Sequence, residues 1–187
     1  MPRSTSWIAL LASIMALACG TGTTHGSPSA SSGAESRAPL SEAQSVDVLT
    51  TINRGEIDLA RLVDARATSA SAHEMAQMMI TQHTEAQSEI AVWSHDASVT
   101  PAQNDVSSEL ARQVAAVRAD LRAASDASVG HTYLVSQVSM HRDALALIDH
   151  RMIPGAHDPA FREPLARVRA AVSAHMAHAQ HMLDDAR

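Results

Sequence analysis

Residues 46–63 read VDVLTTINRGEIDLARLV, and this stretch has the repeat of a helix with one buried face. Its apolar positions recur every three or four residues, which is the period of an amphipathic helix packed on a core. The stripe runs through Val48, Ile52, Glu56, Leu59 and Val63. Glu56 stands in its middle, where burying an unpaired charge costs several kcal/mol. The stretch therefore predicts a helix whose core face carries one acid that needs a partner.

Three further stretches repeat this pattern with a histidine in place of the acid. Their stripes are Met75, Met79, His83, Ala86 and Ile90; Leu134, Val138, His141, Leu145, Ile148 and Met152; and Leu165, Val168, Val172, His175, Ala179 and Met182. Each polar residue lies close to the midpoint of its segment, and midpoints stay level in a bundle whichever way each helix runs. We therefore expect Glu56, His83, His141 and His175 to meet in one layer of the core.

These stripes predict an all-α domain over residues 41–187. Capping signals place helix starts at Ser41, Ser71, Thr100 and Asp158. Alternating spacings of three and four residues are typical of helices packed nearly parallel or antiparallel. The segment 96–127 carries its own apolar stripe without a metal-competent residue, and it is too long for a tight loop. We expect a ferritin-like up-down four-helix bundle in which this segment is an additional connecting (crossover) helix between two hairpins.

The first 40 residues have the composition of an export signal followed by a tether. Arg3 precedes an apolar run, residues 7–17, that is too short to span a bilayer, which predicts a signal peptide over residues 1–18. Cys19 is the single cysteine, and residues 19–40 are rich in Gly, Ser, Thr and Pro, as flexible linkers are. Two alternatives stay open: ordinary cleavage before Cys19, or lipidation of Cys19. We favour lipidation, which predicts a lipoprotein of the cell envelope, periplasmic or anchored to the outer membrane.

The charge pattern argues against a nucleic-acid partner. The formal net charge is −6, and the 14 basic residues, all arginines, are dispersed among 20 acidic ones. A nucleic-acid-binding domain would carry a basic face instead. The sequence also lacks a phosphate-binding glycine loop, the Gly-x-Ser-x-Gly and His-Glu-x-x-His motifs, and paired catalytic carboxylates. These absences favour a protein that is not an enzyme.

Three imidazoles and one carboxylate suit a single transition-metal ion, with zinc, copper and iron as the candidates. A ferritin-like di-iron centre needs a Glu three residues before a His on two of its helices. Here those positions hold Ile80, Val138 and Val172, so di-iron chemistry is not predicted. Met79 and Met140 next to the histidines would favour copper, although methionine in a bundle core more often serves packing.

Two other interpretations of the polar layer stay open. The four side chains, helped by Tyr133 and Gln137, could satisfy one another through hydrogen bonds and a buried water and so set the helix register. They could also line a pocket for a small ligand. The remaining histidines fall off the stripes or near helix ends, where they are predicted to be solvated.

Four short motifs give the chain a family resemblance. They are NRGEIDLA at residues 53–60, Ala76, Met79 and His83 in an A-x-x-M-x-x-x-H run, YLVSQVSMH at residues 133–141, and HMAHA at residues 175–179. In this order, behind an export signal, they resemble the exported bacterial proteins grouped as domain of unknown function 4142, from about Val46 to Leu183. The resemblance implies a ferritin-like helical fold and a periplasmic or outer-membrane location. The chain departs from the family pattern at Gln82, Val129-Gly130 and Ala170.

The function expected from this reasoning is a non-catalytic role in the envelope, with a metal ion bound in the bundle core and a lipid anchor at Cys19 as the contact with a membrane. The alternatives are a metal-dependent redox enzyme that uses the same layer, and a purely structural or stress-related envelope protein without metal.

Overall fold

The computed structural model describes residues 38–186. This range contains five α-helices joined by short connections, and no strand occurs in it. The helices are α2 (Glu42–Asp64), α3 (Ala70–Asp96), α4 (Asp105–Ala123), α5 (Asp126–Leu147) and α6 (Pro159–Asp185). A π-helical turn (Ile148–Met152) and a 3-10 turn (Ile153–Gly155) extend α5 toward the last loop. The prediction of an all-α fold is confirmed. The predicted signal peptide, Cys19 and residues 19–37 of the predicted tether lie outside the described residues.

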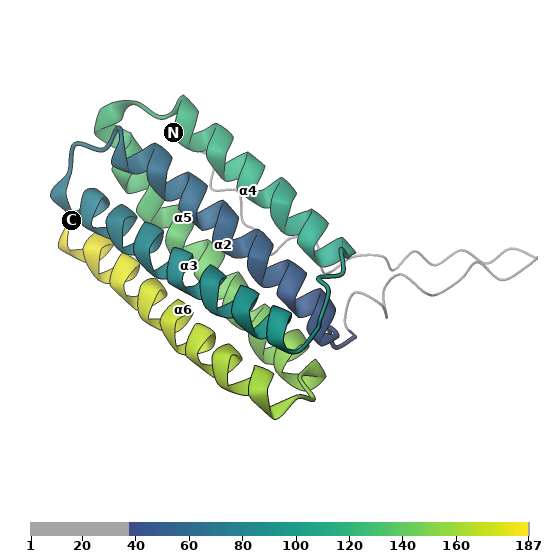
Figure 1. Ribbon diagram of the computed structural model, residues 1–187. Helices are drawn as coiled ribbons and strands as arrows, with labels where there is room; N and C mark the ends of the chain where they lie inside the picture. Colours follow the sequence, from purple (N-terminus) through teal and green to yellow (C-terminus); the bar gives the residue numbers. More distant parts are fainter. Residues whose placement is uncertain (1–37, 187) are drawn as a thin grey trace, which may run out of the picture.

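Figure 1 shows the five helices side by side with nearly aligned axes. α2, α4 and α6 run in one direction, and α3 and α5 run in the other. α2 packs on α3, and α5 packs on α6, while α4 lies along α2 and also contacts α5. The chain therefore leaves α3 at one end of the bundle and returns through α4 to the opposite end, where α5 begins. No helix within residues 38–186 has the length and apolarity needed to cross a bilayer.

Capping side chains set the starts of the first and last described helices as predicted. Ser41 and Gln44 form a capping box at α2, in which each side chain bonds the other residue's backbone N–H. Asp158 caps α6 by accepting a hydrogen bond from the Ala160 N–H, and Pro159 occupies the first helical position. These starts depend on residues close in sequence, which is why the sequence alone predicts them.

Two predicted starts are wrong by a few residues. α3 begins after Ser69 rather than Ser71, and α4 begins after Asn104 rather than Thr100. Asn104 Oδ1 accepts from two backbone N–H groups at once, which makes it a strong N-cap. The backbone N–H of Ala102 donates to the Ala43 carbonyl near the start of α2, so the residues before Asn104 are fixed against α2.

Two apolar clusters fill the bundle, and the polar layer lies between them. One cluster includes Leu59, Val63, Met75, Met79, Tyr133, Val138, Ala179 and Met182. The other includes Val48, Leu49, Ile90, Trp93, Ile148, Phe161, Leu165 and Val172. On α2, α3, α5 and α6 alike, the predicted polar residue separates members of one cluster from members of the other. Burial of each large apolar side chain stabilises the fold by about 2 kcal/mol, which offsets the cost of the polar layer.

α4 approaches α2 closely over the polar layer. A Cβ atom at Gly55 would lie 2.6 Å from Cγ2 of Val114, so the absence of a side chain at Gly55 permits this contact. Arg66 ties the end of α4 to the α2–α3 connection: its guanidinium donates to the carbonyl oxygens of Leu121, at 2.8 Å, and Ala124, at 2.7 Å. These contacts hold α4 against α2 and the α2–α3 connection.

The last residues of the predicted tether are attached to the bundle. Leu40 is buried in the second cluster, and its backbone N–H donates to the carbonyl of Arg151 at 2.8 Å. A Cβ atom at Gly155 would lie 1.9 Å from the Leu40 carbonyl oxygen, so only glycine fits there. The packed part of the chain therefore includes Leu40.

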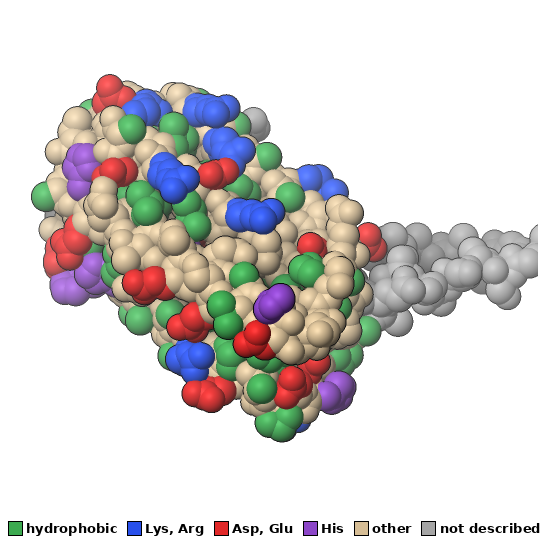
Figure 2. All heavy atoms as spheres, viewed as in Figure 1, with side chains coloured by type: hydrophobic (Ala, Val, Ile, Leu, Met, Phe, Trp, Pro, Cys, Tyr) green, Lys and Arg blue, Asp and Glu red, His purple; other side chains and the backbone are tan. Residues whose placement is uncertain are grey.

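Charges of both signs cover the surface. Figure 2 shows arginine and acidic side chains on the same face. Several of them pair across helices, including Arg118 with Asp58 at 3.0 Å and Arg169 with Asp149 at 2.5 Å. Exposed pairs of this kind contribute little to stability.

Candidate metal centre

All four predicted residues lie in one buried layer, each from a different helix. Glu56 on α2, His83 on α3, His141 on α5 and His175 on α6 are 2%, 4%, 2% and 3% exposed. The three imidazoles form a compact group whose ring centroids are 5.2–5.9 Å apart. One ring nitrogen from each histidine lies within 4.8 Å of the other two. The three histidines could therefore hold a metal ion, and they are the one such group in residues 38–186.

A different oxygen atom orients each imidazole from outside the group. His141 Nδ1 lies 2.9 Å from the backbone carbonyl oxygen of Gln137, one turn earlier on α5. His83 Nδ1 lies 2.9 Å from Asn53 Oδ1, and His175 Nε2 lies 2.7 Å from Gln82 Oε1. Where such an oxygen accepts the ring's N–H, the other ring nitrogen keeps its lone pair. Outer acceptors of this kind are what orient histidines at metal centres.

The ring nitrogens that face one another inside the group carry no proton if the outer nitrogens are the donors. His141 Nε2 and His175 Nδ1 face each other at 3.2 Å, and both carry lone pairs if their outer nitrogens are the donors. His83 Nε2 is buried without any hydrogen-bond partner among the described residues. Facing lone pairs repel unless a cation lies between them. The alternative is a Gln82 amide turned by 180°, whose NH₂ would donate to His175 Nε2 and place the His175 proton on Nδ1.

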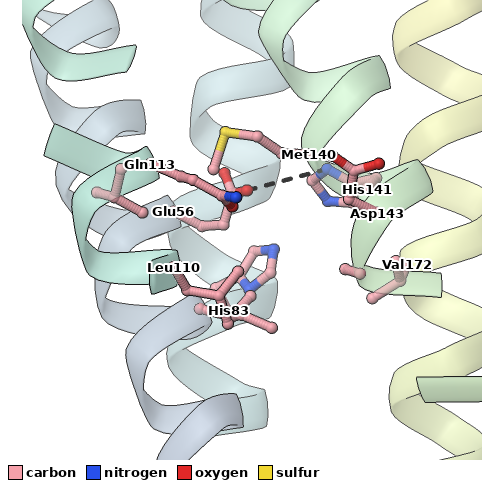
Figure 3. Close-up of a pocket in the computed structure, with 11 residues that line it drawn as sticks. Glu56, His83, Leu110, Gln113, Met140, His141, Asp143 and Val172 are labelled. Atoms are coloured by element: carbon pink, nitrogen blue, oxygen red, sulfur yellow. Dashed lines mark ion pairs between the residues drawn. The ribbon is translucent and has the colours of Figure 1, made fainter. Parts of the chain in front are cut away.

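Glu56 lies beside the histidines and not inside the nitrogen group. Its Oε2 accepts a hydrogen bond from the Gln137 amide at 2.9 Å. Its Oε1 is 3.9 Å from Nδ1 of His141 (dashed line in Figure 3), and Nδ1 is the nitrogen that points away from the group. Burial raises the pKa of Glu56 to about 7, and the Gln137 hydrogen bond opposes that rise. The carboxylate therefore titrates near neutral pH.

The three imidazoles are neutral at neutral pH. Burial lowers the pKa of His141 to about 4, and its bond to the Gln137 carbonyl opposes this shift. Burial, followed by the charges of His141 and His178, lowers the pKa of His175 to about 4. Burial likewise lowers the pKa of His83 well below its ordinary value. A neutral imidazole is the form that coordinates a metal ion, so the layer presents ligands that need not lose a proton.

Other polar atoms of the layer are also left without partners. The Tyr133 hydroxyl, Gln137 Oε1 and Asn53 Nδ2 are buried and make no hydrogen bond within residues 38–186. Burial, with the nearby Glu56 charge, raises the pKa of Tyr133 well above 10. Buried polar groups are normally paired, and of these three residues Asn53 lines one of the two cavities described below.

Two small cavities, each of about 30 Å³, reach the layer. The first, called here the acidic cavity, is lined by Glu56, His83, Gln113, Met140, His141 and Asp143 (Figure 3). The second, the amide cavity, is lined by Asn53, Gln82, His83, Ala86, Ala171 and His175. Each has room for one or two water molecules, whereas pockets for organic ligands measure about 300 Å³ or more. The layer therefore suits an ion or a very small molecule.

Asn53 was not among the predicted site residues, and Gln82 was not predicted to contact His175. Asn53 lies one turn before Glu56 on the buried side of α2, and a polar residue at such a position indicates a partner in the core. Met79 packs in the first apolar cluster, whereas Met140 lines the acidic cavity. His178 and His181 pair with surface acids, at 3.7 Å from Glu74 and 3.2 Å from Asp185, outside the group.

Comparison with known proteins identifies one family. The family model described as a domain of unknown function (DUF4142) matches residues 27–182. No curated protein and no solved structure matches the chain.

Proposed function

The chain belongs to the DUF4142 family, and we propose that it is an envelope protein that holds a single transition-metal ion between His83, His141 and His175. One observation carries this proposal: three neutral imidazoles from three helices turn a nitrogen toward the same small volume, while each is oriented by an oxygen outside it.

The distances agree with an ion of zinc, copper or iron. Metal–imidazole bonds of 2.0–2.1 Å at tetrahedral angles place two ligand nitrogens about 3.3 Å apart. His141 Nε2 and His175 Nδ1 are 3.2 Å apart, which matches this value. The His83 nitrogen lies within 4.8 Å of both, so its distance to each exceeds the tetrahedral spacing by about 1.5 Å or less.

Glu56 supplies the only carboxylate among the four predicted ligands. It would offset the charge of the ion from its present position, or become a fourth ligand after giving up its bond to Gln137. Because the layer has one carboxylate, a ferritin-like di-iron centre is not supported. The helix directions, with α4 returning the chain between the α2–α3 and α5–α6 pairs, support a ferritin-like connection. The small cavities support a binding role over turnover of an organic substrate.

One further observation favours a second candidate, a structural network without metal. Hydrogen bonds already link Gln137 to Glu56, His141 to His175, and His175 to Gln82. The two candidates differ in one proton: the metal site needs it on His175 Nε2, and the closed network needs it on Nδ1. Nitrogen-15 NMR of the histidine rings in the metal-free protein would report the tautomer.

Metal stoichiometry tests the binding proposal directly. The full-length protein, stripped of metal, would be titrated with Zn(II) and Cu(I), and we expect one equivalent to bind. His141→Gln should abolish binding and keep the helical content, whereas His178→Gln, a surface control one turn beyond His175, should bind normally. No binding in the wild type, or unchanged binding in His141→Gln, would refute the proposal. Oxygen consumption with added Fe(II) or Cu(I) that requires His141 would favour a redox enzyme.

The proposed location rests on residues outside the described range. The apolar run at residues 7–17, the lone Cys19 and the Gly- and Ser-rich stretch after it support export and a lipid anchor. Palmitate labelling that disappears in Cys19→Ala would agree with the anchor. Recovery of unlabelled wild type in the periplasmic soluble fraction would contradict it.

A further inference from the structure

The two cavities that reach the histidines differ in charge. The acidic cavity contains the carboxylates of Glu56 and Asp143, whereas the amide cavity contains none. His83 lines both cavities, and its Nε2 is buried without a partner. His83 therefore borders both cavities, which also share Ile52, Ala144 and Val172, and only the acidic cavity has acidic residues in its lining.

We propose that the metal ion reaches the histidines through the acidic cavity, between α4 and α5, and that Asp143 and Met140 capture it at the outer wall. This inference rests on the proposed function, because it concerns the route to the same ion site. It assigns a role in metal uptake to Asp143 and Met140, which are not among the proposed ligands.

The wall of the acidic cavity changes from exposed to buried along this route. Asp143 is exposed, Met140 and Gln113 are half-buried, and Glu56 and His141 are buried. Figure 3 shows Met140 reaching from α5 toward the side of the cavity that Glu56 occupies. An incoming ion would therefore meet a carboxylate and a thioether before the inner carboxylate and the imidazoles.

The side chains of Asp143 and Met140 should favour different metal ions. A cleft with negative charge concentrates cations and raises their association rate, in a manner that falls with salt. A thioether prefers soft ions such as Cu(I), while a carboxylate serves harder divalent ions. Asp143 should thus matter most for Zn(II), and Met140 for Cu(I).

The test measures uptake rates with the full-length metal-free protein in a stopped-flow instrument. Asp143→Asn should slow Zn(II) uptake about three- to tenfold at low ionic strength, and the difference should vanish at high salt. Met140→Leu should slow Cu(I) uptake and leave Zn(II) uptake unchanged. Both variants should still bind one equivalent at equilibrium. The matched controls are Glu85→Gln and Met78→Leu on α3, which line neither cavity.

A third variant examines the competing route. Ala171→Leu narrows the amide cavity and should leave both uptake rates unchanged. Slower uptake in Ala171→Leu, or wild-type rates in both Asp143→Asn and Met140→Leu, would overturn the proposed route while the ion site itself stands. A wild-type protein that takes up no metal would remove the site and the route together, so the two failures are distinguishable.

Discussion

The contribution of the buried Glu56 carboxylate to the stability of the metal-free protein should fall as the pH rises toward neutrality. Its pKa is about 7 in the folded protein, against an ordinary value of 4.5. Because the folded state holds this proton more tightly than the unfolded state, its contribution to stability is complete below pH 4.5 and is lost as the pH rises to about 7. Each pH unit in that window is worth about 1.4 kcal/mol, so the total loss is about 3 kcal/mol.

Glu56→Gln isolates this contribution. Glutamine keeps an oxygen that can accept from the Gln137 amide but cannot ionise, so it imitates the protonated acid. The histidines are present in both proteins, so their titration cancels in the difference. The free energy of unfolding would be measured by urea denaturation in the presence of a chelator, at intervals from pH 4.5 to pH 8.

The two proteins should be equally stable near pH 4.5, and the variant should be more stable by about 3 kcal/mol above pH 7. A bound divalent cation should shrink this difference, because it favours the ionised carboxylate. A stability difference that stays constant across the pH range, or one that favours the wild type at pH 8, would show that Glu56 is not held in a low-dielectric layer.

Three further outcomes follow from the same layer. The metal-free wild type should gain stability relative to His141→Gln as the pH rises from about 4 to 6.5. The reason is that the His141 ring binds a proton more weakly in the folded protein than in the unfolded chain. Urea denaturation at several pH values would measure the difference in the free energy of unfolding. Asn53→Leu should weaken metal binding about 10- to 100-fold in a chelator competition, since it removes the acceptor that orients His83, and equal affinity would exclude that role. Gly55→Ala should lower the free energy of unfolding by about 1–3 kcal/mol through contact with Val114, and Val114→Ala should recover part of the loss; additive effects in the double mutant would contradict the contact.

The sequence alone predicted the helices and the residues that interrupt their apolar faces. Stripes with a period of 3.6 residues and caps such as Ser41 depend on neighbours within one or two turns, so they can be recognised without tertiary information. The midpoint positions of Glu56, His83, His141 and His175 also carried over, because parallel and antiparallel helices of similar length keep their centres level. The predicted starts of α3 and α4 were wrong by a few residues, since several cap-forming residues compete within a few positions.

Only the tertiary structure determined the hydrogen bonds and the cavities of the polar layer. The rotation and height of each helix, to within about 1 Å, decide these details, and packing of the whole core sets that precision. The details are the histidine partners Asn53 and Gln82, the separation of Glu56 from the nitrogen group, and the two cavities. A repeat of apolar residues specifies which face of a helix is buried. It does not specify which ring nitrogen faces its neighbours, because that choice depends on hydrogen bonds between helices distant in sequence.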